Sequence, residues 1–351
     1  MSSETVAQLL TQCPLPISDP SDILLGHGSG AKLTAQLVER LLLPAFRNPT
    51  LEALDDAAVL AMEGTRLAFT TDSYVVTPIF SPGGDIGELA VNGTVNDLAM
   101  GGAQPAFLSL ALILEEGLPM ADLAQVVDSA RRAAARAGVQ IVTGDTKVVG
   151  RGSGDKVFVN TTGIGCVPPA VNLYSRNVRA GDAILLSGSI GDHGMAILST
   201  RQGLEFDGAI KSDTAPLNGL SAAMPEASTV IHALRDPTRG GLAATVIEIA
   251  SRQRLGMEID ESAIAVGDAF RGACEILGLD PLFVANEGKL VCFVPEAKSE
   301  RVLAAMRSHP LGALATRIGR VVSDHPGLVL MHTQVGGNRV LDLPFAEARI
   351  C

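Results

Sequence analysis

The chain contains two successive series of short apolar runs and amphipathic stretches, and Val167-Pro168-Pro169 separates them. In the first series, two strand-like runs alternate with helical stretches twice over, which predicts a sheet with its helices on one face. A second α/β series starts near Gly181. Because single hydrophobic cores stop growing near ~250–300 residues, the 351 residues fit two domains better than one. The pattern therefore predicts an α+β fold with two domains.

The same pattern predicts the domain limits and the main elements. We expect an N-terminal arm at residues 1–25, a first domain at 26–168, a second at 169–343 and a tail at 344–351. The first domain should hold helices at 32–43, 85–100 and 120–137 and strands at 57–62, 66–71, 106–114, 139–143 and 157–165. The second should hold a strand at 181–186, further strands at 290–294 and 328–332, and helices at 193–201, 241–252, 267–277 and 297–308. Pro44 should end the first helix, and Gly336-Gly337 with Pro344 should let the tail leave the packed domain.

Charge and cysteine content narrow the functional class. The net charge of −11 and the absence of Trp disfavour nucleic acid, whose binding rests on clustered cations and aromatic platforms. No signal peptide is expected, and the longest apolar run, at 106–114, is far shorter than the ~20 residues that span a bilayer. The five cysteines lack CxxC spacing, so neither a disulfide framework nor a zinc site is expected. We expect a cytoplasmic protein with reduced thiols that binds neither nucleic acid nor membrane.

Aspartates recur at the ends of apolar runs in the first domain. Asp55 and Asp56 precede one run, Asp72 follows the next, and Asp145 follows a third. Ligand sites often gather where strands end and loops converge. Asp also caps turns and helices, and for each of these residues that structural role remains open.

Asp97 is harder to explain by capping. In the helix expected at 85–100, Asp97 falls on or beside the stripe of apolar residues that recurs at i, i+3 and i+4. A buried carboxylate without a partner costs several kcal/mol or changes its pKa. A divalent cation would remove that cost, and Mg²⁺ works with one or two carboxylates and phosphate. A hydrogen bond to backbone or to a lysine would remove it as well.

The second domain carries Asp236-Pro237-Thr238-Arg239-Gly240-Gly241 just before an apolar helix. Asp is a good helix cap, and two glycines allow another backbone to approach. Helix N-termini also favour phosphate, so capping and nucleotide binding are both compatible with this motif. Residues 26–32 are not a P-loop, and no dinucleotide-binding or kinase catalytic-loop motif is present. An ATP site in this chain must therefore belong to another fold.

Six segments, in this order, resemble the PurM-like superfamily, which is related to aminoimidazole ribonucleotide synthetase. They are Gly28-Ser29-Gly30-Ala31-Lys32, Asp55-Asp56-Ala57-Ala58-Val59, Thr70-Thr71-Asp72, Asn96-Asp97-Leu98-Ala99-Met100-Gly101-Gly102, Thr143-Gly144-Asp145-Thr146-Lys147 and Asp236-Pro237-Thr238-Arg239-Gly240-Gly241. Each segment is weak evidence alone, whereas the ordered set spans nearly the whole chain. The resemblance implies a PurM-like architecture with an N-terminal ATP-binding α/β domain and a C-terminal α/β domain.

Within that superfamily the chain is most similar to the HypE family of hydrogenase maturation factors. Three features carry this resemblance: Gly26-His27-Gly28-Ser29-Gly30, Asn286-Glu287-Gly288-Lys289 and the terminal Arg349-Ile350-Cys351. Selenophosphate synthetase differs because its reactive Cys or selenocysteine lies in the Gly-rich loop, and residues 26–32 contain no Cys. Ala348 stands where the usual ending of the family has Pro, a change that leaves the terminal thiol in place.

The resemblance implies a site, its cofactors and its partners. It implies a homodimer that binds ATP and Mg²⁺ in the N-terminal domain near the dimer interface. The metal-binding residues would be Asp56, Asp97 and Asp236, and the nucleotide-binding residues would be Lys32, Asp72, Gly144, Asp145, Thr146 and His27. His27 fits a loop hydrogen bond as well as a phosphate contact. The partners would be HypF, which delivers a carbamoyl group, and the HypC–HypD complex, which receives cyanide on iron for [NiFe] hydrogenase.

The resemblance also implies the chemistry. A carbamoyl group on the thiol of Cys351 would be phosphorylated by ATP on its oxygen and then lose phosphate and protons to give a thiocyanate. Lys147 and Glu287 would transfer protons and orient the substrate, and a structural ion pair is the alternative role for them. Two other functions remain: a PurM-like phosphotransferase, such as selenophosphate synthetase or thiamine-phosphate kinase, and a non-catalytic carrier of a thiol-bound group.

Overall fold

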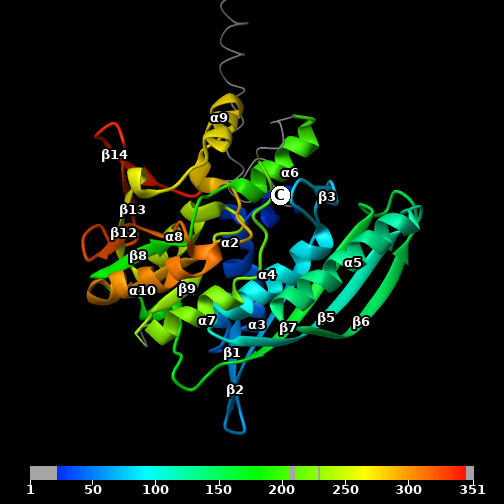
Figure 1. Cartoon of the computed structure of the whole chain (residues 1–351), viewed down its shortest axis with the longest axis horizontal. Coiled ribbons are helices and arrows are strands. Elements are labelled where there is room, and N and C mark those ends of the chain that lie inside the picture. The colour runs from blue at the N-terminus through cyan, green and yellow to red at the C-terminus, as the bar shows by residue number, and fades with distance from the viewer. Residues whose placement is uncertain (1–21, 205–209, 228–229, 345–351) are drawn as a thin grey trace, which may run out of the picture.

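In the computed structural model, which describes residues 22–204, 210–227 and 230–344, two sheets with their helices lie side by side (Figure 1). The first sheet belongs to the N-terminal half of the chain, and the second sheet belongs to the C-terminal half. No helix among these residues is long and apolar enough to cross a membrane. The expected α+β class with two sheet-based units is confirmed.

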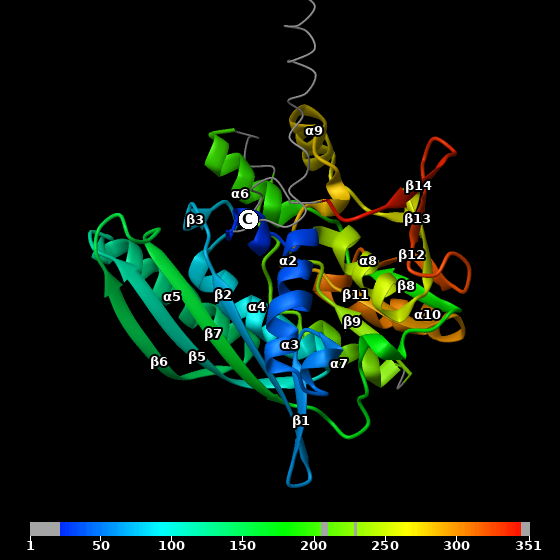
Figure 2. The ribbon, with the colours of Figure 1, turned by 180° about the vertical axis from the view of Figure 1, so that it is seen from behind.

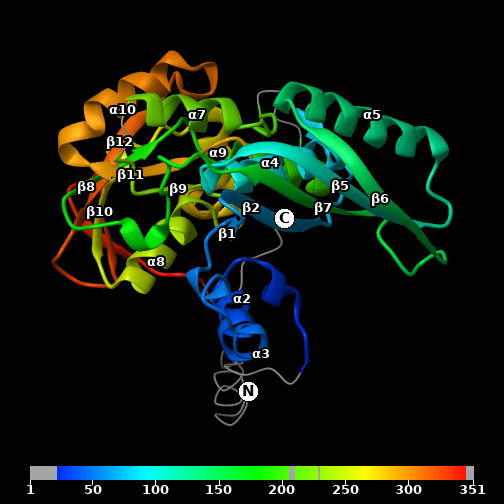
Figure 3. The ribbon, with the colours of Figure 1, turned by 90° about the horizontal axis from the view of Figure 1, so that it is seen from below.

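The first sheet has five strands. In spatial order they are β1 (Ala58–Met62), β2 (Thr65–Tyr74), β7 (Val157–Cys166), β5 (Gln104–Glu115) and β6 (Gln140–Val149). Only β5 and β6 are parallel, because α5 (Met120–Ala137) connects them as a crossover helix. A short hairpin of β3 (Phe80–Ser81) and β4 (Gly84–Asp85) leads into α4 (Ile86–Met100). Helices α4 and α5 cover one face of the sheet, as predicted (Figure 3).

Helix α4 is the central element of the molecule. Asp85 caps it by accepting hydrogen bonds from the backbone N–H groups of Gly87 and Glu88. All of its side chains except those of Glu88 and Asp97 are buried, because one side faces the first sheet and the other faces the C-terminal half. Its last turn contributes Ala99 and Met100 to a core of the second domain. A helix that is apolar nearly all round is expected in such a position.

The second sheet has seven strands. In spatial order they are β14 (Asn338–Leu341), β13 (Val329–His332), β10 (Gly256–Asp260), β12 (Thr316–Val322), β8 (Asp182–Leu186), β11 (Val291–Pro295) and β9 (Ala233–Arg235). Its helices are α6 (Asp192–Gln202), α7 (Asn218–Ala227), α8 (Gly241–Gln253), α9 (Asp268–Leu277) and α10 (Glu296–Ser308). Helices α6, α8 and α9 share a core with one face of this sheet, and α7 and α10 share a core with the other. Strand β8 is buried along its whole length because helices cover both faces.

The face of the first sheet that no described helix covers, here called the open face, is apolar. Phe69 on β2 pairs with Ile164 on β7, and Ile164 pairs with Phe107 on β5, so the three side chains form one row across the sheet. They are 41%, 40% and 48% exposed, whereas the alternate residues Ala68 and Thr70 are buried beneath α4. A contiguous exposed row of large apolar side chains is typical of an interaction surface.

The first expected helix differs from the prediction. Helix α2 (Lys32–Leu37), a π-helical turn (Val38–Leu42) and α3 (Leu43–Phe46) run on without a break, and together they project from the body beside β1 and β2 (Figures 2 and 3). The prediction that Pro44 ends this helix is wrong. In the π-helical turn the N–H of Leu43 donates to the carbonyl of Val38, so the hydrogen-bond ladder is already shifted where Pro44 lacks its N–H.

Two strand predictions also need correction. Strand β6 continues to Val149, so Asp145 lies within a strand and not after one, and Asp72 likewise lies within β2. These strands pair with long neighbours, and the ladder hydrogen bonds extend them past the apolar run that predicted them.

Gly336 and Gly337 form the turn between β13 and β14 and do not begin a tail. The proposed limits 1–25, 26–168, 169–343 and 344–351 remain predictions, and residues 1–21 and 345–351 lie outside the described residues.

A buried asparagine joins the two halves of the molecule. The Nδ2 group of Asn96 on α4 donates to the carbonyls of Ala215 (3.1 Å) and Glu287 (3.2 Å). Its Oδ1 accepts from the N–H of Leu217 at 2.7 Å. Asn96 therefore fixes α4 to two loops of the C-terminal half by three hydrogen bonds.

We expect Asn96→Ala to lower the free energy of unfolding by about 3 kcal/mol, because it leaves one N–H and two carbonyls buried without their partner. Chemical denaturation of both proteins measures the change. Asn177→Ala, which removes one hydrogen bond to the carbonyl of Asn172 in a loop, is the matched control and should cost about 1 kcal/mol or less. Equal stability of the Asn96 variant and the wild type would contradict this role.

Candidate active site

A cavity of about 380 Å³ lies where the two halves meet. Its walls come from the loop before α2, the end of β2, the middle of α4, the segment before α8 and the segment before β11. The predicted residues Asp72, Asp97, Asp236 and Glu287 all line it, although they are far apart in the sequence. The cavity is therefore an acidic pocket at the domain junction.

The carboxylates around this cavity raise each other's pKa. Burial, followed by the charges of Asp236, Asp72 and Asp56, holds the pKa of Asp97 well above its usual range. Burial, opposed by the charge of Arg235 and supported by that of Asp72, raises the pKa of Asp236 to about 6. The pKa of Glu287 is raised by burial and by the charges of Asp236 and Asp72. The negative charges of these carboxylates are poorly compensated by nearby cations. A bound cation would lower the electrostatic free energy of the site.

Asp97 faces β2 from the helix. Its Oδ2 accepts a hydrogen bond of 2.8 Å from the hydroxyl of Thr70, so a short polar contact replaces the lysine or backbone partner considered above. That contact satisfies one oxygen and leaves the carboxylate at the cavity wall. The helical periodicity correctly placed Asp97 beside the buried stripe of α4.

Asp236 does not cap helix α8. The cap position is Gly240, which has a φ of 76°, and the helix starts at Gly241, with a φ of 63°. A Cβ on Gly241 would lie 2.5 Å from the carbonyl oxygen of Leu282, so this glycine allows a second backbone to approach, as predicted. The segment thus turns Asp236 into the cavity instead of towards the helix end.

Asp56 lies next to this cavity but is held by a cation. Its Oδ1 is 2.7 Å from Nε of Arg235, and Arg235 also reaches Glu248 on α8. The other oxygen of Asp56 is buried and has no hydrogen-bond partner. Burial raises the pKa of Asp56, and Arg235 opposes that shift. Asp56 therefore has one oxygen free to meet a ligand.

The structure places Gly144, Asp145, Thr146 and Lys147 away from the cavity. They lie in β6, the edge strand, three strands from β2 and hence roughly 14 Å along the sheet. Lys147 pairs across to Ile113 on the open face, and its Nζ is 2.9 Å from Oδ2 of Asp145. Lys147 and Glu287 therefore do not meet within one chain.

The N-terminal residues have other partners in this chain. The Nζ group of Lys32 is 2.7 Å from Oδ2 of Asp342, and its N–H donates to the carbonyl of Pro344. Nδ1 of His27 contacts the N–H of Leu24 at 2.9 Å, which is the loop hydrogen bond considered for this residue. Cys351 lies outside the described residues. Among the described cysteines, Cys166, Cys274 and Cys292 form no disulfide.

The sequence matches the family models of the AIR synthase related protein, with the N-terminal domain at residues 54–167 and the C-terminal domain at 179–330. It is 53% identical to the carbamoyl dehydratase HypE of Azotobacter vinelandii over 93% of this chain and 96% of the relative. It is 49% identical to the carbamoyl dehydratase HypE of Escherichia coli over 94% of this chain and all of the relative. The chain belongs to the HypE family of carbamoyl dehydratases.

Solved structures of the HypE family have the same fold. A HypE crystal structure in complex with ATP is 50% identical, with a TM-score of 0.79, and the match covers 94% of this chain and 100% of that one. HypE in a crystal structure with HypF is 46% identical, with a TM-score of 0.83, over 88% of this chain and 99% of that one. Thiamine monophosphate kinase from Aquifex aeolicus, at 19% identity and a TM-score of 0.60, shares the fold alone.

Two residues near this HypE-family cavity, Asp213 and His193, were not predicted from the sequence. Asp213 forms a buried ion pair of 2.8 Å with Lys289, and its other oxygen accepts from the N–H of Glu287. This contact holds the segment that carries Glu287. Lys289 belongs to a motif that the sequence analysis used, whereas Asp213, in a loop with no pattern of its own, gave no signal.

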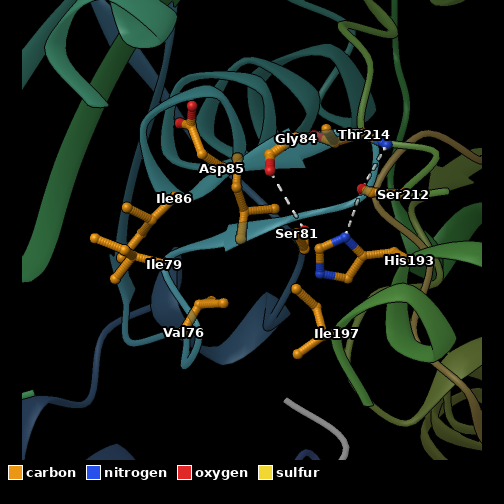
Figure 4. Close-up of a pocket in the computed structure, with 11 residues that line it drawn as sticks. Val76, Ile79, Ser81, Gly84, Asp85, Ile86, His193, Ile197, Ser212 and Thr214 are labelled. Carbon is orange, nitrogen blue, oxygen red and sulfur yellow. Dashed lines mark hydrogen bonds between the residues drawn. The ribbon is translucent and has the colours of Figure 1, made fainter. Parts of the chain in front are cut away.

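The other missed residue is His193, which lies between the cavity and a small pocket of about 10 Å³ (Figure 4). Its Nδ1 is 2.8 Å from the hydroxyl of Ser212. Burial lowers the pKa of His193 to about 4, so its ring is neutral at physiological pH and acts as one donor and one acceptor. A polar helix residue in an otherwise apolar run gives no clear sequence signal.

The donor set in the cavity suits a hard cation, although it does not form a complete metal site. Among the described residues no group of three or more His, Cys, Asp or Glu side chains is already arranged to hold a metal ion. The unpartnered oxygen of Asp56 and the crowded carboxylates of Asp97 and Asp236 are nevertheless oxygen ligands in need of positive charge. Mg²⁺ usually completes such partial sets with water and phosphate.

We expect Asp97→Asn to weaken the binding of ATP in the presence of Mg²⁺ by about tenfold, because it removes one charge that would face the cation. Since the raised pKa means that the ionised carboxylate is disfavoured in the folded state, the variant should melt in EDTA at the same temperature as the wild type or higher. Calorimetric titration and thermal melting measure the two effects. Asp128→Asn, at an exposed site on α5, is the control. Unchanged affinity in the Asp97 variant would rule out a role for Asp97 in the metal site.

Proposed function

We propose that this chain dehydrates a carbamoyl group carried on the thiol of Cys351 to a thiocyanate and hydrolyses ATP to ADP and phosphate. The observation that carries the proposal is the acidic cavity at the domain junction, in a chain about 50% identical to carbamoyl dehydratases along most of its length. Because the thiocyanate supplies a cyanide ligand for iron, the reaction serves [NiFe] hydrogenase maturation. It uses ATP, so we place the enzyme in the cytoplasm.

The proposed reaction balances in two steps. The oxygen of the group S–CO–NH₂ attacks the γ-phosphorus of ATP, ADP leaves, and one N–H proton is released. Phosphate then leaves together with the second N–H proton, which gives S–C≡N. Glu287 lies at the cavity, where burial and the charge of Asp236 raise its pKa, and we propose that it takes part in the proton transfer.

The remaining residues would bind and orient the nucleotide. Mg²⁺, held by Asp97 and Asp236 with the free oxygen of Asp56, would neutralise charge on the phosphates. Asp72 lines the same cavity, and Arg239 is a cation at its wall. Lys32 and His27 lie at the loop that forms one side of the cavity, although their side chains have other contacts in this chain. We propose that these contacts exchange for phosphate when ATP is bound.

A homodimer through the open face would complete the site. The row of Phe69, Ile164 and Phe107 supplies an apolar surface for a second copy, and isologous dimers use the same patch on both chains. Gly144, Asp145, Thr146 and Lys147 lie in the edge strand of the same sheet, and Lys147 points to the open face. We propose that they reach the nucleotide site across this interface.

HypF is the proposed donor of the carbamoyl group, since a HypE structure of 46% identity is a complex with HypF. The HypC–HypD complex is the proposed acceptor of the cyanide. The thiol of Cys351 would serve both transfers, because one group would meet a donor, an active site and an acceptor in turn. ATP consumption also distinguishes this proposed enzyme from a non-catalytic carrier, which would bind its partners without consuming ATP.

We expect mass spectrometry to detect a carbamoyl adduct, and then its dehydrated form, on wild-type protein incubated with HypF, carbamoyl phosphate and ATP. Cys351→Ala should show neither adduct because the acceptor thiol is absent. Glu287→Gln should accumulate the carbamoyl adduct, since loading needs only the thiol. Cys166→Ala, which removes the thiol of an exposed cysteine elsewhere, is the control. Dehydration on the Cys351→Ala protein, or ATP turnover independent of the adduct, would refute the proposed function.

We expect Phe107→Glu to convert the dimer to a monomer, because it places a charge at the β5 end of the apolar row. Light scattering coupled to gel filtration gives the mass. Ile276→Glu, at a 78% exposed apolar residue on α9, is the matched control and should leave the mass unchanged. A wild-type protein that is monomeric at all concentrations would exclude the homodimer.

A further inference from the structure

Tyr74 lies inside the acidic cavity, and neither the sequence motifs nor the reaction assigns it a role. It is the last residue of β2 and is 8% exposed. Its hydroxyl donates to Oδ2 of Asp72 at 2.8 Å, and both residues line the cavity. The hydroxyl is thus part of the site and not of its outer support.

Helix α4 leaves room for this hydroxyl. A Cβ on Gly93 would lie 2.0 Å from the oxygen of Tyr74, so any side chain at position 93 would displace the phenol. Glycine in the middle of a helix costs about 1 kcal/mol relative to alanine. The buried helix carries that cost at Gly93, where the missing Cβ leaves the space that the hydroxyl of Tyr74 occupies.

The surroundings keep the phenol a hydrogen-bond donor. Burial and the charges of Asp72, Glu287 and Asp97 hold the pKa of Tyr74 well above its ordinary value. The proton therefore stays on the oxygen at physiological pH. The hydroxyl donates this proton to Oδ2 of Asp72, so the hydrogen bond orients that carboxylate.

We propose that Tyr74 is a positioning residue, which holds the carboxylate of Asp72 in the orientation that binds ATP. The inference rests on the proposed function, because that function assigns the nucleotide to this cavity. It concerns nucleotide binding and not the later loss of phosphate. Tyr74 therefore acts on substrate affinity through one hydrogen bond to Asp72.

A double-mutant cycle tests the proposal. We expect Tyr74→Phe to raise the Kd for ATP, measured by calorimetry with Mg²⁺, by about tenfold and to leave turnover at saturating ATP within about twofold of the wild type. Asp72→Asn should raise the Kd at least as much. Since Tyr74 acts through Asp72, the double variant should bind no more weakly than Asp72→Asn alone. Tyr174→Phe, at the other tyrosine of the chain, is the matched control and should bind ATP normally.

Two results would overturn the proposal: an unchanged Kd for Tyr74→Phe, or independent, additive effects in the double variant. Gly93→Ala provides a second route, because it displaces the ring without removing the hydroxyl, and it should weaken ATP binding as Tyr74→Phe does. Melting temperatures within a few degrees of the wild type confirm folded proteins. A wild type that binds ATP but leaves the carbamoyl group intact would refute the proposed function and leave this inference standing.

Discussion

Electrostatic crowding at the junction of the two halves is the constraint on which the rest of the structure depends. Asp72 and Asp97 come from the first domain, and Asp236 and Glu287 come from the second, yet all four face one cavity. Burial and mutual repulsion raise the pKa values of Asp97, Asp236 and Glu287, so gathering these carboxylates in one place costs free energy. Such a cost is tolerated where a ligand offsets it, and a divalent cation bound to these oxygens would have the charge to do so.

Helix α4 holds this junction together. It is buried against the first sheet on one side, and on the other Asn96 fixes it to two loops of the second domain. The same helix carries Asp97 to the cavity and provides, at Gly93, the space for Tyr74. The carbonyl of Glu287 is one of the groups that Asn96 holds. Stability of the domain contact and geometry of the site are therefore determined by the same turns of one helix.

The two faces of the first sheet have different surroundings. One face packs on α4 and α5 and forms the wall that leads to the cavity, and the open face presents an apolar row with Lys147 beside it. The residues of the ordered motifs are thus divided between the cavity and the open face. The homodimer proposed above would bring these residues together and would also cover the apolar row.

The sequence by itself determined the fold class, the family resemblance and the place of Asp97 beside the buried stripe of α4, because helical periodicity and ordered motifs are local properties. It could not determine that Asp145 lies inside a strand, since pairing with β5 extends β6 beyond its apolar run. It also missed Asp213 and Tyr74, whose roles exist only through contacts with Lys289 and Asp72 in the folded chain. The separation of Lys147 from Glu287 was likewise decided by tertiary structure, because Lys147 lies on the open face of the edge strand β6 and Glu287 lies at the cavity.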